Sequence, residues 1–158
     1  MLPSLKVLFL CTGNSCRSQM AEGWARELKT GQIDAYSAGT DPGRLDPLAV
    51  KAMAEAGVDI SEHFSKSPEE LYEVTLDVVV TVCDAANETC PVFPGDTVVV
   101  HRGFDDPPRL ARGAATEGEA LRHYRRVRDE IRRFVEALPG SLGGGDEVRN
   151  ATKAEDGS

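Results

Sequence analysis

Short apolar runs alternate along the chain with longer stretches in which apolar residues recur every three or four positions. The runs are bounded by polar or turn-forming residues, which predicts buried strands. They fall at residues 5–10, 33–38, 77–82 and 97–100. The stretches between them have the period of amphipathic helices.

Helix boundaries can be predicted from capping residues. A first helix begins at Ser18 and ends near Gly31. Asp46 is a predicted N-cap, with Pro47 at the first helical position and Gly57 after the last turn. Further helices are predicted from residue 67 and over residues 116–138.

This alternation predicts an α/β fold: a three-layer sandwich in which helices flank a four-stranded parallel sheet. We assign residues 1–138 to one domain and residues 139–158, which are Gly-rich and polar, to a flexible tail. Sites in such sheets lie beyond the carboxyl ends of the strands. Cys11 and Cys83 each follow a predicted strand, so we expect both thiols at the same edge.

Composition and charge narrow the function classes. The 158 residues contain 18 Lys and Arg against 26 Asp and Glu, a net charge of −8, which disfavours nucleic-acid or membrane-surface binding. No apolar run approaches the roughly 20 residues that cross a bilayer, and the start does not resemble a signal peptide. We therefore expect a cytoplasmic protein whose four cysteines are reduced. Their spacings do not fit a zinc site, and we expect no metal.

The segment between the first strand and the first helix has the composition of an oxyanion-binding loop. Its backbone N–H groups and the helix dipole attract an anion, Arg17 adds a two-pronged contact, and Cys11 supplies a nucleophile. The same field predicts a lowered pKa for Cys11, with Ser18 as a hydrogen-bond donor to its sulfur. Gly13 and Asn14 suit positive φ angles. The predicted oxyanion-binding residues are Thr12, Gly13, Asn14, Ser15, Cys16, Arg17 and Ser18.

Residues 10–24, LCTGNSCRSQMAEGW, resemble the phosphate-binding loop of low-molecular-weight protein tyrosine phosphatases and of the thioredoxin-coupled arsenate reductases that share their fold. The resemblance continues through Tyr36-Ser37-Ala38-Gly39, through residues 80–90 and through Gly103-Phe104-Asp105-Asp106-Pro107, and it covers the chain to about Leu138.

Three features of the sequence favour the reductase branch. Gln19 stands where the phosphatases usually have proline. Cys83 and Cys90, with six residues between them, resemble the redox pair of the reductases. Asp106-Pro107 is followed by Pro108-Arg109 and lacks the aromatic residues that bind a tyrosine ring in many phosphatases.

The resemblance implies a catalytic set of Cys11, Arg17, Cys83, Cys90 and Asp106. Cys11 would attack arsenate, Cys83 would form a disulfide with Cys11, and Cys90 would then form a disulfide with Cys83 that thioredoxin reduces. Asp106 would act as the general acid. Asp105 is then a supporting or exposed carboxylate, and Cys16 is structural.

A potassium site of some related reductases is matched here by Asn14, Glu22 and Ser37, but Lys66 stands at the fourth position. An ammonium group there would repel a cation, which argues against a potassium requirement.

The implied partners are arsenate and thioredoxin, with no tightly bound cofactor, and we expect a monomer. Two alternatives stay open: a phosphatase acting through a Cys11 phosphoenzyme, and a sensor that uses the cysteine pair as a switch. His63, His101 and His123 match no motif and are given no role.

Overall fold

The computed structural model describes residues 4–88, 90–93, 95–140, 142 and 147–150, the last of these as backbone. It contains one sheet with the strand order β2-β1-β3-β4-β5. The strands are β1 (Leu5–Cys11), β2 (Ile33–Gly39), β3 (Val78–Thr81), β4 (Val98–His101) and β5 (Glu147–Asn150). The first four pair in parallel, as the sequence predicts.

Strand β5 is a difference from the prediction, because it lies within the stretch expected to be a flexible tail. It pairs antiparallel with β4, from Val98 opposite Asn150 to His101 opposite Glu147. Its backbone groups extend the ladder of β4, which would otherwise be an open edge among the described strands. Residues 143–146 and 151–158 of the expected tail lie outside the described residues.

The long helices are α1 (Arg17–Leu28), α2 (Pro47–Glu55) and α5 (Glu117–Glu136). Two of these three begin where the sequence predicts, after Asp46 and after Thr116, whereas the first begins at Arg17 without a side-chain cap, because Ser18 lies inside it and its hydroxyl contacts the Cys11 sulfur. Asp46 accepts a hydrogen bond from the Leu48 N–H at 2.9 Å and so caps α2 as predicted. The short elements were not all foreseen: they are η1 (Pro68–Leu71), α3 (Asp84–Glu88), α4 (Pro107–Leu110) and η2 (Ala111–Gly113).

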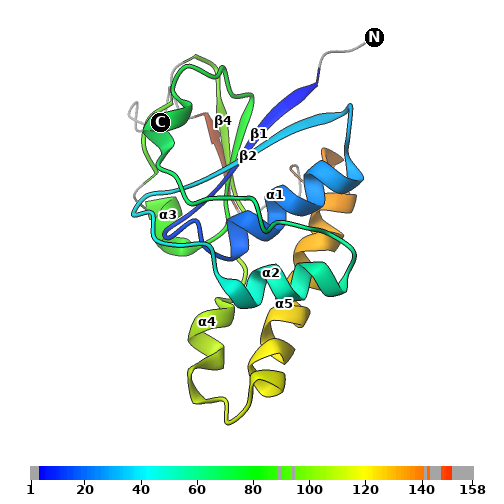
Figure 1. Cartoon of the computed structure of the whole chain (residues 1–158). Helices are drawn as coiled ribbons and strands as arrows, with labels where there is room; N and C mark the ends of the chain where they lie inside the picture. The colour runs from blue at the N-terminus through cyan, green and yellow to red at the C-terminus, as the bar shows by residue number, and fades with distance from the viewer. Residues whose placement is uncertain (1–3, 89, 94, 141, 143–146, 151–158) are drawn as a thin grey trace.

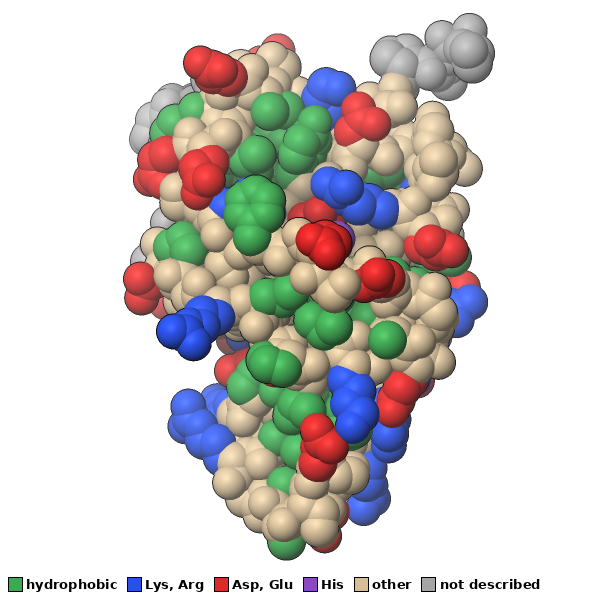
Figure 2. All heavy atoms as spheres, in the orientation of Figure 1, with side chains coloured by type: hydrophobic (Ala, Val, Ile, Leu, Met, Phe, Trp, Pro, Cys, Tyr) green, Lys and Arg blue, Asp and Glu red, His purple; other side chains and the backbone are tan. Residues whose placement is uncertain are grey.

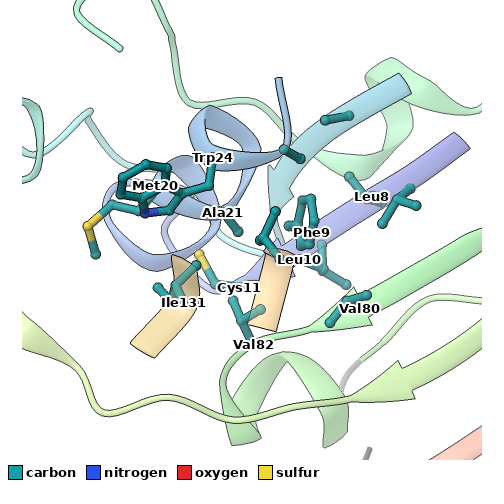
Figure 3. Packing of buried hydrophobic residues seen from close by; sticks show 14 of the residues in the cluster. Leu8, Phe9, Leu10, Cys11, Met20, Ala21, Trp24, Val80, Val82 and Ile131 are labelled. Carbon is teal, nitrogen blue, oxygen red and sulfur yellow. The ribbon is translucent and has the colours of Figure 1, made fainter. Parts of the chain in front are cut away.

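Helices α1 and α5 pack against each other beside the sheet, and α3 lies across the strands from them (Figure 1). The core between the layers combines the apolar run of β1 with one face of α1 and α5. Figure 3 shows Trp24 and Met20 of α1, Ile131 of α5 and Phe9 of β1 in this cluster. Cys11 ends the buried run of β1, so the nucleophile of the predicted loop is attached to the best-packed part of the molecule.

The surface carries both signs of charge. Acidic and basic side chains are interspersed over the face seen in Figure 2. Among the described residues, no helix combines the length and apolar character that a membrane span requires. Attraction of an anion must therefore come from local groups, because the protein as a whole is acidic.

Candidate active site

Cys11 and Cys83 lie at the same edge of the sheet, as predicted. Cys11 is the last residue of β1, and Cys83 follows the neighbouring strand β3. The Thr12 hydroxyl lies 3.4 Å from the Cys83 sulfur, so the second thiol contacts the loop that begins at the first. Both thiols are unpaired and buried.

The loop from Cys11 to Cys16 turns its carbonyl groups outward. The N–H groups of Thr40 and Asp41 donate to the carbonyl oxygens of Cys11 and Thr12 at 3.0 and 2.8 Å. Gly43 N–H likewise donates to Gly13, Asp46 N–H to Ser15 and Met20 N–H to Cys16, each at 2.9 Å. With the carbonyl oxygens held on the outside, the loop N–H groups are left to bind an anion. Among the described residues, no side chain caps the start of α1, where the Ser18 N–H contributes a hydrogen bond to the Cys11 sulfur.

Asn14 fixes the shape of the loop. Its φ angle is 50°, as expected, whereas Gly13 is not among the described residues with positive φ. The Asn14 side-chain amide donates to the Ser18 hydroxyl at 2.8 Å, and its side-chain oxygen accepts from the Lys66 N–H at 3.0 Å. This fully buried side chain therefore links the loop to Ser18 of α1 and to the distant segment at Lys66.

The Cys11 sulfur receives hydrogen bonds from Ser18 and Asn14. Because Asn14 already donates to the Ser18 oxygen, the Ser18 hydroxyl is free to donate to the sulfur, 2.8 Å away. The Asn14 N–H donates to the sulfur at 3.2 Å. Burial nevertheless raises the pKa of Cys11, and the hydrogen bonds from Ser18 and Asn14 only partly oppose this. The prediction of a lowered pKa is wrong in this structure, because the packed loop removes water from the thiol.

Arg17 connects the loop to the predicted general acid. One guanidinium nitrogen donates to the Phe104 carbonyl oxygen at 2.9 Å, and another lies 3.6 Å from an Asp106 carboxylate oxygen. Asp105 instead pairs with Arg126 of α5 at 2.9 Å, which matches its expected supporting place. A cleft of about 680 Å³ is lined by Thr12, Arg17, Cys83, Asp84, Ala85, His101, Gly103, Phe104, Asp105, Asp106 and Arg109.

Gln19 and His63 support the loop, and sequence reasoning gave neither of them this part. The Gln19 side-chain amide donates to the carbonyl oxygens of Asn14 and Phe64, both at 3.0 Å. Burial lowers the pKa of His63, so at neutral pH one ring nitrogen carries the hydrogen that is donated to the Gln19 side-chain oxygen at 3.0 Å. Gln19 is fully buried. The presence of Gln19 in place of the usual proline is a sequence signal for this supporting role as well as for the reductase branch.

Gly39, at the end of β2, also supports the loop. A Cβ atom there would lie 2.7 Å from the Asn14 nitrogen and 2.9 Å from the Gly13 carbonyl carbon. Only glycine lets β2 approach the loop this closely. The segment after it, residues 40–46, supplies the outer hydrogen bonds of the loop and was missed because nothing local in the sequence marks it.

The residues that match a potassium site in related reductases form a cluster around Glu22. The Ser37 hydroxyl donates to one Glu22 oxygen at 2.5 Å, and the Lys66 ammonium lies 3.9 Å from that oxygen. Arg26 contacts the other Glu22 oxygen at 2.8 Å. Positive side chains thus already surround this buried carboxylate. Within the described part of the chain, no three His, Cys, Asp or Glu residues form a group suited to a metal ion.

Cys16 and Cys90 are the two cysteines outside the Cys11–Cys83 pair. Cys16 is as buried as Cys11, and burial raises its pKa well above the ordinary value. Cys90 is half-buried beyond α3, and its sulfur lies 3.6 Å from the Pro91 carbonyl oxygen. The structure therefore brings Cys83 to the loop, whereas Cys90 follows α3 along the chain.

Comparison with known proteins gives a consistent class. The family model for low molecular weight phosphotyrosine protein phosphatase matches residues 6–147, so the chain belongs to this family. An arsenate reductase of Halalkalibacterium halodurans is 46% identical over 132 residues, which are 84% of this chain and 93% of the relative. A solved arsenate reductase in the phosphate binding state has a TM-score of 0.71 at 33% identity and covers 87% of this chain and 98% of its own. The low molecular weight protein tyrosine phosphatase of T. tengcongensis has a TM-score of 0.66 at 26% identity and covers 88% and 100%.

Proposed function

We propose that this protein reduces arsenate to arsenite through Cys11, Cys83 and Cys90. The observation that carries the proposal is the position of Cys83, whose sulfur lies 3.4 Å from the Thr12 hydroxyl at the mouth of the Cys11 loop. A phosphatase needs one nucleophile there, whereas a two-electron reduction needs a second thiol. The relatives named arsenate reductase support the same assignment.

In the first step the loop N–H groups and Arg17 bind arsenate, and the Cys11 thiolate attacks arsenic(V). A sulfur–arsenic bond forms, and an oxygen of arsenate leaves as water after protonation. Asp106, which lines the cleft 3.6 Å from Arg17, is the proposed donor of that proton. The Arg17 guanidinium group would therefore contact both the bound arsenate and the proposed proton donor Asp106.

In the second step the Cys83 thiolate attacks the Cys11 sulfur. The new sulfur–sulfur bond forms as the sulfur–arsenic bond breaks, and its electron pair stays on arsenic, which leaves as arsenite. Cys90 then attacks Cys83, which frees Cys11 and gives a Cys83–Cys90 disulfide. Thioredoxin is the proposed reductant of that disulfide, because each turnover must begin with reduced thiols. The proposed location is the cytoplasm, and the proposed active form is the monomer.

Hydrolysis of phosphomonoesters is the second candidate, favoured by the family to which the chain belongs and by the set of Cys11, Arg17 and Asp106. Phosphate and arsenate share shape and charge, so the same loop binds both. We propose this as a residual activity, in which Cys11 attacks phosphorus and displaces the alcohol, and water then attacks the phosphorus of the Cys11 phosphoenzyme, releasing phosphate and the free thiolate.

The test is steady-state NADPH consumption with arsenate, thioredoxin and thioredoxin reductase. Turnover is expected for the native protein, and Cys83→Ser or Cys90→Ser should reduce it to at most one turnover per molecule. Hydrolysis of an aryl phosphate is the internal control, because Cys90→Ser leaves the loop intact and should preserve it. Full thioredoxin-coupled turnover in either variant would refute the relay.

A further inference from the structure

His101 lies at the end of β4 and contacts both sides of the Cys83 position. Its Nε2 lies 3.0 Å from a carboxylate oxygen of Asp84, the residue after Cys83. Its Nδ1 lies 2.9 Å from the Thr81 hydroxyl, two residues before Cys83. The ring is 11% exposed, whereas the Asp84 side chain is 88% exposed. A largely buried group thus holds an exposed one beside the cleft.

Asp84 is the first residue of α3, and this short helix contacts the Cys83 thiol directly. The Ala86 N–H donates to the Cys83 sulfur at 3.4 Å, and the Asn87 N–H donates to the Cys83 carbonyl oxygen at 3.2 Å. Holding Asp84 in place therefore holds the turn that binds Cys83. No sequence motif predicts the contact between His101 and Asp84, because His101 ends β4 whereas Asp84 begins α3.

A disulfide between Cys83 and Cys90 requires Cα atoms about 4.4–6.8 Å apart. The five residues of α3 advance the chain by about 7.5 Å along the helix axis, and they lie between the two cysteines. The contact of the Cys83 sulfur with Ala86 belongs to this helical path. To bond with Cys90, the Cys83 sulfur must give up its contact with the Ala86 N–H, so contacts that hold the start of α3 oppose formation of the disulfide.

We propose that His101 is a positioning residue of the thiol relay. Through Asp84 it stabilises α3 while Cys83 and Cys90 are both thiols, and so it favours the dithiol form over the disulfide. This keeps Cys83 directed toward the Cys11 loop until Cys11 has reacted. The inference rests on the proposed function, since it assigns a role within the Cys83–Cys90 exchange.

The test is the equilibrium between dithiol and disulfide in the full chain, mixed with reduced and oxidised thioredoxin at set ratios. Alkylation followed by peptide mass spectrometry measures the Cys83–Cys90 disulfide. Asp84→Ala and His101→Gln should each shift the equilibrium toward the disulfide by about three- to tenfold. This corresponds to a reduction potential lower by about 15–30 mV. Asp84→Ala changes an exposed side chain and guards against a folding defect in the buried His101 variant.

The double variant tests whether His101 acts through Asp84. If it does, combining the two changes shifts the equilibrium no further than one change alone. Asp105→Ala is the matched control, because it removes an exposed carboxylate of the same cleft that pairs with Arg126 at 2.9 Å, and it should leave the equilibrium unchanged. Additive shifts, or single variants within twofold of the native protein, would overturn the role of His101. A native protein that forms no Cys83–Cys90 disulfide would instead overturn the relay itself.

Discussion

The oxyanion loop and the segment that follows Cys83 meet at one edge of the sheet but are built in opposite ways. In the loop, the polar side chains of Asn14, Ser18 and Gln19 are fully buried and hydrogen-bonded to one another or to backbone groups. After Cys83, the chain forms the five-residue helix α3, which begins with the exposed Asp84. Further along the chain, Val92 is 62% exposed.

This difference matches the tasks proposed for the two regions. An anion-binding loop gains from N–H groups that are fixed before the substrate arrives, because no energy is then spent on reorienting them. A thiol that must meet first Cys11 and then Cys90 gains from contacts that are few and easily exchanged. The same edge of the sheet thus carries the rigid oxyanion loop and the Cys83 thiol, whose contacts must change during the proposed relay.

Asn14→Ala is expected to have the largest effect on this comparison. It removes two buried hydrogen bonds and places alanine at a φ of 50°. The free energy of unfolding should fall by about 2–4 kcal/mol, and kcat/KM for arsenate should fall about 100-fold because the N–H groups lose their alignment. Denaturant titration and steady-state kinetics measure these two changes.

Asn14→Gly separates the two causes, since glycine adopts the backbone angle without supplying the side-chain contacts. We expect it to recover less than half of the lost stability. An Asn14→Ala protein within twofold of the native activity would contradict the view that the loop is held rigid by this residue.

Ser18→Ala tests the thiol inside the loop and should have an intermediate effect. The Ser18 hydrogen bond lowers the pKa of Cys11, so its loss raises that pKa further. The thiolate then forms at higher pH, and the pH profile of Cys11 alkylation by iodoacetamide shifts in the alkaline direction. At pH 7 alkylation should slow at least about tenfold, since a hydrogen bond to a charged group contributes about 1.5–3 kcal/mol and about 1.4 kcal/mol corresponds to a factor of ten.

Ser18→Thr keeps the hydroxyl group and is the control for this variant, with a profile close to that of the native protein. Mass spectrometry distinguishes Cys11 from the other thiols. A profile that moves to lower pH in Ser18→Ala would show that the hydroxyl does not stabilise the thiolate.

Exchange of sodium for potassium should have the smallest effect. The Lys66 ammonium lies 3.9 Å from Glu22, and the Lys66 N–H holds the Asn14 side chain, so the loop is supported without an added cation. We expect kcat/KM for arsenate to change by less than twofold at constant ionic strength. A strong rise with potassium would mean that Lys66 does not fill this part of the site.

The sequence predicts the loop well because its parts are contiguous. Cys11, Arg17 and Ser18 fall between a predicted strand and a predicted helix, and local signals are sufficient there. The supports of the loop could not be predicted in this way: Gln19 reaches His63 across 44 positions, and the outer hydrogen bonds come from residues 40–46. The pKa direction of Cys11 was also missed, because burial depends on how distant segments pack around the thiol.

Strand β5 shows the same limit at the scale of the fold. Glu147–Asn150 is polar and lacks an apolar alternation, so nothing local indicates a strand. Its place is set by the free backbone edge of β4, which a sequence pattern does not display. Of the parallel strands, β1, β3 and β4 are mostly apolar in sequence, and all four agree with the predicted ranges to within a few residues.

The outward carbonyl groups of residues 11–16 have a consequence for selectivity. Each is engaged outside the loop, so a peptide group cannot turn over to present oxygen to the bound ion without breaking a contact. The loop therefore selects anions over cations and binds phosphate and arsenate through the same N–H groups. Choice between the two anions falls to chemistry after binding, because only arsenic(V) accepts the electron pair that two thiols release. Phosphate, abundant in cells, would then compete for the site as a reversible inhibitor and would not be consumed by reduction.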